Sequence, residues 1–352
     1  MGQANDSFMA VDVGGTHVRV ALAHRATRGR VHITNVTTYV GAEYSSLGNI
    51  LCAFMAAHAT PIDHCVLACA GYRLDSVVVN NNLPWVVDTD QLRNALGLQD
   101  LSSLNDFEAL AYATKYIDER PTTLLSTCSK GNDIGPVIIV GPGTGLGSSV
   151  FVPGTPRSVV LVSEAGQINL APGTELEMRV LAILARADPY VSYEQVLSGP
   201  GLINLYRALG ECRNEPAPLD DPEAITRSAQ LGDDGLTRQT LDTFCALLGS
   251  FVGNMAMLYN ASGGVYLAGG VVSHIRDFLL QSDFLERFLA KGQTRPFLER
   301  VPVRLIEHGP TGIVGAVNWY LQKLDSAIQR TDDATPSFPG DACRVTMEEC
   351  RP

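Results

Sequence analysis

The sequence lacks the clustered ligands that mark metal centres and disulfide frameworks. Its eight cysteines include no Cys-x-x-Cys pair, and its seven histidines are scattered along the chain. Several of the cysteines lie in apolar stretches, as Cys65 and Cys69 do. This usage predicts free thiols in a reducing cytosol, and it argues against a cluster of side chains that would hold a metal ion.

Positive charge and long apolar runs are also scarce. The chain has 26 Lys and Arg against 37 Asp and Glu, a formal net charge of −11, which argues against nucleic acid or an anionic membrane as the main partner. We find no stretch that resembles a membrane span, and residues 1–10 lack the basic start and apolar core of a signal peptide. We therefore expect a cytoplasmic protein with no nucleic-acid or membrane partner.

What is present is the composition of a soluble globular protein. The 352 residues are 45% hydrophobic and 18% charged. A chain of this length can bury a large core, and the length favours two domains over one.

A glycine turn stands near the start of the chain, in the stretch AVDVGGTHVRVALAH. Asp12 precedes Gly14, Gly15 and Thr16, but the spacing fits neither a Rossmann motif nor a Walker A loop. The residues after the turn alternate between apolar and polar as a half-buried strand does. We therefore predict a hairpin with strands over 8–13 and 17–23 and a turn at 14–16.

The same design returns further along the chain. The stretch VIIVGPGTGLGSSVFV at 137–152 turns through Gly143, Thr144 and Gly145. Two such hairpins suggest duplicated halves whose bare backbone amides grip one polyphosphate. A third turn, Gly269-Gly270, follows a helical apolar pattern at 241–260 and precedes an amphipathic helix expected over 275–291. A turn of this kind lets a flat ring such as adenine approach the backbone.

Six motifs stand in the order found in bacterial-type glucokinase, and the chain is identified as similar to that family. The motifs are DVGGTHVRVAL, LNDFEALA, VGPGTGLGSSVF, SEAGQINLAP, VLSGPGLINLYRAL and LAGGVV. The resemblance covers about residues 8–322. A related family of sugar kinases and repressors shares the glycine loops but normally carries a cysteine-rich zinc motif, and no such cysteines follow Gly166 here.

The resemblance implies an α/β chain with the two-domain, actin-like ATPase (ribonuclease H-like) fold. Each domain would be a mixed sheet flanked by helices, with the active cleft between them. The small domain would comprise 1–114 and 309–325, and the large domain 115–308. We expect a loosely ordered tail over 326–352 and a surface loop over 210–221.

The resemblance also implies ATP-dependent phosphorylation of D-glucose to glucose 6-phosphate, with ATP and Mg²⁺ as cofactors and a homodimer as the assembly. Asp12 would hold Mg²⁺ through water. The residues expected to contact the nucleotide are Val11, Asp12, Val13, Gly14, Gly15, Thr16, Gly143, Thr144, Gly145, Gly269 and Gly270.

Transfer to a sugar hydroxyl needs one group that accepts the hydroxyl proton, and a carboxylate suits this role. Asp106 is expected to be this base by its place in the family motif, which outweighs the simpler interpretation that it is the N-cap of the following helix. The resemblance implies that six residues bind the sugar: Asn82, Asn105, Asp106, Glu164, Gln167 and Glu194.

Simpler structural interpretations stand beside two of these assignments. Glu164 fits a polar turn. Glu194 fits an acid in the first turn of a helix, with Ser192 and Gln195 spaced as a capping box.

One residue departs from the family pattern. The motif is usually Glu-x-Gly-His, and here the last position is Gln167. An amide donates to a sugar hydroxyl but cannot become a cation. The departure therefore bears on which sugar is bound more than on catalysis. The alternatives are a kinase of another hexose, such as mannose, fructose or an amino sugar, and a sugar-sensing protein without turnover.

Overall fold

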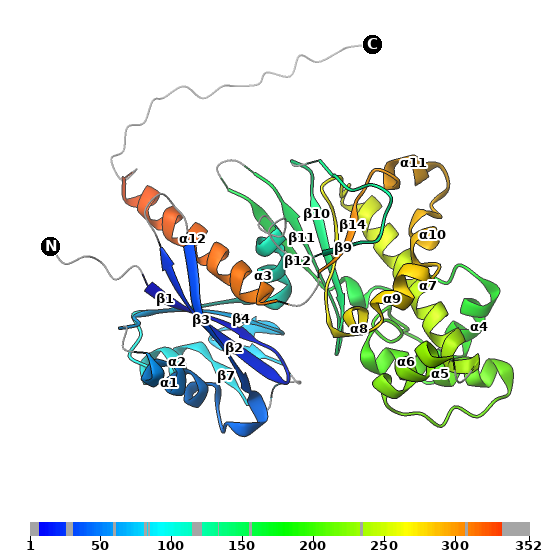
Figure 1. Cartoon of the computed structure of the whole chain (residues 1–352), viewed down its shortest axis with the longest axis horizontal. Helices are drawn as coiled ribbons and strands as arrows, with labels where there is room; N and C mark the ends of the chain where they lie inside the picture. Colours follow the sequence, from blue (N-terminus) through cyan, green and yellow to red (C-terminus); the bar gives the residue numbers. More distant parts are fainter. Residues whose placement is uncertain are drawn as a thin grey trace, which may run out of the picture.

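The computed structural model describes residues 7–25, 31–58, 61–80, 83, 85–114, 122–132, 134–154, 157–232, 235–306 and 309–332. Two mixed sheets stand side by side, and helices α3 (Asp106–Ala113) and α12 (Thr311–Asp332) lie near the boundary between them (Figure 1). Asn82 falls outside the described residues, so its expected role stays a prediction.

The first sheet has the strand order β3-β2-β1-β4-β8. Its strands are β1 (Ser7–Val13), β2 (His17–Arg25), β3 (Val31–Val40), β4 (His64–Cys69) and β8 (Asp100–Asn105). β1, β2 and β3 pair antiparallel, whereas β4 and β8 run parallel to β1. A small second sheet joins β5 (Tyr72–Leu74), β6 (Val77–Val79) and β7 (Val87–Asp88).

Helices cover both faces of this sheet because its central strands are apolar on both sides. Helix α1 (Leu47–Ala57) packs on one face, and α2 (Thr89–Ala95) lies on the same side (Figure 1). The opposite face is covered by α3 and α12.

The second large sheet repeats this topology. Its order is β12-β11-β10-β13-β14-β9, in which β12, β11 and β10 pair antiparallel and β13 and β14 run parallel to β10. The strands are β9 (Thr122–Leu124), β10 (Val137–Pro142), β11 (Leu146–Val152), β12 (Val159–Ser163), β13 (Gly264–Leu267) and β14 (Val303–Ile306). The duplicated design and both predicted hairpins, β1–β2 and β10–β11, are therefore confirmed.

The core of the second half is built around one long helix. Helix α7 (Gly235–Leu258) is the one described helix long and apolar enough to cross a membrane, which the sequence interpretation overlooked. Its most apolar window is 78% buried inside the fold, as in the core helix of a globular domain. The remaining helices are α4 (Glu175–Leu184), α5 (Gly199–Arg213), α6 (Pro222–Leu231), α8 (Gly270–His274), α9 (Arg276–Gln281), α10 (Phe284–Leu289) and α11 (Arg295–Leu298).

Three boundaries differ from the predictions. The helix expected over 275–291 is divided into α9 and α10, because the Ser282 hydroxyl accepts a hydrogen bond from the Phe284 amide in a turn between them. Residues 210–213 of the expected surface loop are the last turn of α5. Helix α12 runs on to Asp332, seven residues into the expected tail, whereas residues 333–352 lie outside the described part of the chain.

The two halves meet at α3. The Phe107 ring lies so close to the strands β10 and β11 that a Cβ on Gly147 would come within 1.9 Å of it, and a Cβ on Gly141 within 2.6 Å. The Ser149 hydroxyl of β11 donates to the Phe107 carbonyl at 2.7 Å. The first turn of α3 therefore follows β8 in the first sheet and is seated on the second large sheet.

Candidate active site

The expected acids gather where three parallel strands end. In the register of the first sheet, Val13 of β1 lies beside Cys69 of β4, which lies beside Asn105 of β8. Asp12 and Asp106 therefore emerge at the same edge of the sheet, which is where ligands of open α/β sheets usually bind. Val11 and Val13 are core residues with buried side chains, so only their backbone faces this edge.

Asp106 is the first residue of α3, but it is not the N-cap that the simpler interpretation made of it. The cap is Asn105, whose Oδ1 accepts hydrogen bonds from the amides of Phe107 at 2.9 Å and Glu108 at 3.4 Å. The Asn105 Nδ2 donates to the Gly71 carbonyl at 3.0 Å. The Asp106 carboxylate accepts from the Phe107 amide at 3.0 Å.

The charge of Asp106 is held in an unfavourable environment. The pKa of this carboxyl is raised to about 6, chiefly by burial; the nearby charges of Asp12 and Glu164 also raise it, and the hydrogen bond from the Phe107 amide lowers it. Asp12 comes from the first sheet, and Glu164 follows β12 of the second large sheet. Residues from both halves of the chain therefore act on this one carboxyl.

Asp12 is paired with Arg19, a residue that the sequence interpretation missed. The Arg19 Nη1 lies 3.2 Å from the Asp12 Oδ2, and the two side chains are 43% and 17% exposed. Burial raises the pKa of Asp12 although the Arg19 cation lowers it. The hairpin register places these two residues directly opposite each other, so cross-strand pairing alone would have found the contact.

The carboxylate donors at this edge fit Mg²⁺, which prefers oxygen ligands and usually keeps several waters. No group of three or more His, Cys, Asp or Glu that could hold a metal occurs among the residues that the structure describes. A magnesium ion here would therefore be bound by Asp12 and by phosphate oxygens of a nucleotide.

Two of the expected sugar-binding residues are hydrogen-bonded to each other. The Gln167 Nε2 donates to the Glu194 Oε1 at 2.9 Å, and the Leu146 amide donates to the Glu194 Oε2 at 2.8 Å. A Cβ on Gly145 would lie 2.7 Å from the same Oε2. Glu194 thus touches both the second glycine turn and the segment that carries Gln167.

Glu194 is not an acid in the first turn of a helix, as its simpler interpretation held. It lies in a turn before α5, whose N-cap is Ser198. The Ser198 hydroxyl donates to the Glu194 carbonyl and accepts from the Gly201 amide. This explains the composition of the VLSGPG stretch, because a Cβ on Gly201 would lie 2.7 Å from the Glu194 carbonyl oxygen.

The second and third glycine turns adjoin. The Gly199 amide at the start of α5 donates to the Gly143 carbonyl at 2.7 Å. Gly269 has a φ of +102°, and a Cβ there would lie 2.5 Å from the Pro142 carbonyl oxygen. Only glycine fits this position. Gly15, Thr16, Thr144 and Gly270 are exposed, which leaves their backbone accessible to a ligand.

Solved structures share the overall fold. The structure of a glucokinase from an Antarctic psychrotroph matches with a TM-score of 0.81 at 32% identity, covering 90% of this chain and 99% of that one. A ROK family glucokinase from Streptomyces griseus, solved with glucose and AMPPNP, matches in fold with a TM-score of 0.59 at 20% identity, covering 90% and 99%. The fold is the actin-like ATPase fold of sugar kinases.

The sequence comparisons identify the family to which this chain belongs among the sugar kinases. A family model described as Glucokinase matches residues 9–323. A glucokinase-like protein of Xylella fastidiosa is 46% identical over 320 residues, which cover 90% of this chain and 95% of the relative. A glucokinase of Marinobacter nauticus is 36% identical over 308 residues, 87% and 94% of the two chains. The chain belongs to the glucokinase family, and it is an ATP-binding sugar kinase.

Proposed function

We propose that the protein transfers the γ-phosphoryl group of ATP to the 6-hydroxyl of D-glucose. The observation that carries the proposal is the site of Asp106, at the start of α3 and beside acids from both sheets. A carboxyl with a pKa of about 6 is largely ionised at neutral pH, yet it is more basic than an exposed aspartate. It therefore suits the acceptance of a hydroxyl proton.

In this proposal Asp106 takes the proton of the 6-hydroxyl as the oxygen attacks the γ-phosphorus, and ADP leaves with the electrons of the broken P–O bond. Mg²⁺, bound through Asp12 and the phosphates, would neutralise charge on the transferred group. The exposed turns at 14–16 and 143–145 would bind the phosphates through backbone amides, and Gly269 and Gly270 would lie against the adenine.

The sugar would be held by Asn82, Asn105, Glu164, Gln167 and Glu194. Carboxylates and amides suit vicinal hydroxyls because they form paired hydrogen bonds. Glucose and a nucleotide analogue are bound in the Streptomyces griseus structure, which supports this pair of substrates for the present chain.

A kinase of another hexose is the second candidate, because Gln167 stands where the family usually has histidine. Initial rates with ATP and Mg²⁺ across glucose, mannose, fructose and glucosamine decide between the two. Glucose should give the highest kcat/KM. A preference for another hexose would support the second candidate, and no turnover with any hexose would refute both. The expected homodimer is tested by light scattering on the purified protein.

A further inference from the structure

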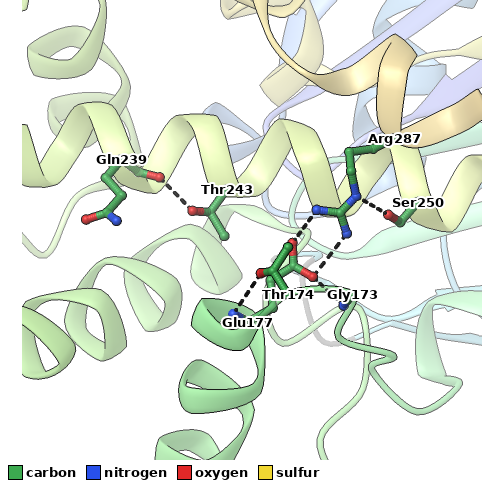
Figure 2. A network of polar contacts seen from close by, with 7 residues as sticks. All are labelled: Gly173, Thr174, Glu177, Gln239, Thr243, Ser250 and Arg287. Atoms are coloured by element: carbon green, nitrogen blue, oxygen red, sulfur yellow. Dashed lines mark hydrogen bonds and ion pairs between the residues drawn. The ribbon is translucent and has the colours of Figure 1, made fainter. Parts of the chain in front are cut away.

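A buried ion pair joins helices α4 and α10 and includes none of the expected site residues. Arg287 of α10 donates through both terminal nitrogens to the carboxylate of Glu177 of α4, at 2.6 and 3.0 Å (Figure 2). The Arg287 Nε donates to the Ser250 hydroxyl of α7 at 3.1 Å. The side chains of Arg287 and Glu177 are only 19% and 3% exposed. One guanidinium thus joins three helices.

The ion pair is also hydrogen-bonded to the chain just before α4. The Gly173 amide donates to the Glu177 Oε2 at 2.6 Å, and the Thr174 hydroxyl accepts from the Glu177 amide at 3.2 Å (Figure 2). Residues 173 and 174 end the segment that begins at Glu164 and contains Gln167. We call residues 164–174 the sugar segment.

The sugar segment pairs with the chain that carries Glu194. The Glu194 amide donates to the Gly166 carbonyl at 2.8 Å, the Tyr193 amide to the Ile168 carbonyl at 3.1 Å, and the Leu170 amide to the Val191 carbonyl at 2.8 Å. This short ladder has the expected sugar-binding side chains at one end and the Glu177–Arg287 pair at the other.

The residue next to Glu194 closes the connection. The Tyr193 ring is buried, and its centroid lies 4.8 Å from that of Phe251 of α7. Its hydroxyl accepts a hydrogen bond from the Asn254 Nδ2 of the same helix at 3.4 Å. Both strands of the ladder are therefore attached to the helical core close to the ion pair.

We propose that Glu177 and Arg287 are positioning residues that set the sugar segment, and with it Gln167 and Glu194, for binding of the hexose. The inference rests on the proposed function, because it takes these two side chains to bind the substrate. A planar guanidinium suits this task, since its bidentate contact fixes orientation as well as distance. A displacement of about 1 Å in a group that positions the substrate is enough to lower the rate of reaction by roughly a hundredfold.

A purely structural pair would affect stability alone, so the experiment must separate affinity from stability. Removing one partner leaves a buried charge and is strongly destabilising, whereas replacing both with apolar side chains is often neutral. The principal variant is therefore Glu177→Met/Arg287→Met. The control is Phe288→Leu, which removes packing from a fully buried side chain of the same helix without touching the pair.

For each protein, the KM for glucose, the KM for ATP and kcat are measured together with the unfolding temperature, and the Kd for glucose is measured by calorimetry. We expect the double variant to unfold near the wild-type temperature, to raise the KM and Kd for glucose by roughly tenfold or more, and to keep the KM for ATP within about twofold. Arg287→Lys, which keeps the charge but loses the fork, should show a smaller rise. Phe288→Leu should lower the unfolding temperature and leave the KM for glucose unchanged.

A double variant with the wild-type KM and Kd for glucose would overturn the positioning role. The same follows if Phe288→Leu raises the KM for glucose as much as the double variant does. Wild-type protein that neither binds nor phosphorylates glucose would instead overturn the proposed function. The two failures are thereby distinguished.

Discussion

Replacing Asp106 with asparagine should remove activity and at the same time stabilise the protein. The asparagine side chain would keep an oxygen that accepts from the Phe107 amide, but it cannot take up a hydroxyl proton. Turnover should therefore fall by roughly a hundredfold or more, the usual scale for loss of a general base.

The gain in stability follows from the raised pKa of Asp106. Folding moves this pKa from 3.8 to about 6, so the folded state binds the proton more tightly than the unfolded chain does. Ionisation of Asp106 above pH 4 therefore lowers the free energy of unfolding. This loss of stability reaches its full value once the pH is above the folded-state pKa. With 1.36 kcal/mol per pKa unit, the cost is about 3 kcal/mol at pH 7.5 and about half of that at pH 5. Asp106→Asn should recover these amounts.

The assay is denaturant unfolding of wild type and Asp106→Asn at pH 5 and pH 7.5, with turnover measured on the same preparations. Asp100→Asn is the matched control. Burial alone would raise the pKa of Asp100, but the Ser102 hydroxyl and the Lys323 ammonium lower it below its ordinary value. The ionised Asp100 therefore stabilises the fold, and this variant should lose stability. An Asp106→Asn variant that is less stable than wild type at pH 7.5 would refute the burial argument. Near-normal turnover would refute the assignment of the base.

Three further predictions concern the neighbouring residues. Gly145→Ala should raise the KM for glucose as well as the KM for ATP, because its Cβ would lie 2.7 Å from the Glu194 carboxylate. Gly143→Ala, whose Cβ meets nothing within 4 Å, should raise the KM for ATP alone. Equal effects of the two variants on the KM for glucose, measured by initial rates, would contradict this. Gln167→Ala removes the 2.9 Å hydrogen bond to Glu194 and should raise the KM for glucose by about tenfold or more; an unchanged KM would place Gln167 outside the sugar site. Arg19→Met removes the contacts that lower the pKa of Asp12, so protonation of Asp12 should extend to higher pH and the KM for Mg-ATP should rise at the acid end of the range. A KM for Mg-ATP with the pH dependence of wild type would contradict the role of Asp12 at the metal.

The hairpins could be predicted from the sequence because their information is local. A glycine turn between two alternating runs determines which residues pair, and both β1–β2 and β10–β11 formed as expected. The same local reasoning, carried one step further, would have paired Asp12 with Arg19. The helix break at Ser282 was missed because the apolar period continues through it and a single hydroxyl makes the turn.

The contacts of Glu194 could not be predicted in this way. Gln167 and Leu146 are 27 and 48 residues distant in sequence from Glu194, and each lies at the end of an element or in an irregular segment. No periodicity relates such positions to one another. The ion pair of Glu177 and Arg287, which are 110 residues apart, could not be predicted from the sequence for the same reason.

The packing of helix α12 on the first sheet has a consequence for how the chain folds during synthesis. The face formed by Phe8, Ala10, Val66 and Ala68 packs against Ile313, Ala316, Val317 and Tyr320 of α12. These partners leave the ribosome some 240 residues after β4, when the strands and the whole second half have already been made. Until then a nascent chain carries an apolar sheet face that α3 alone cannot cover. Chaperone dependence should therefore be greatest late in translation, and a chain that stops at residue 306 should aggregate although both of its large sheets are present.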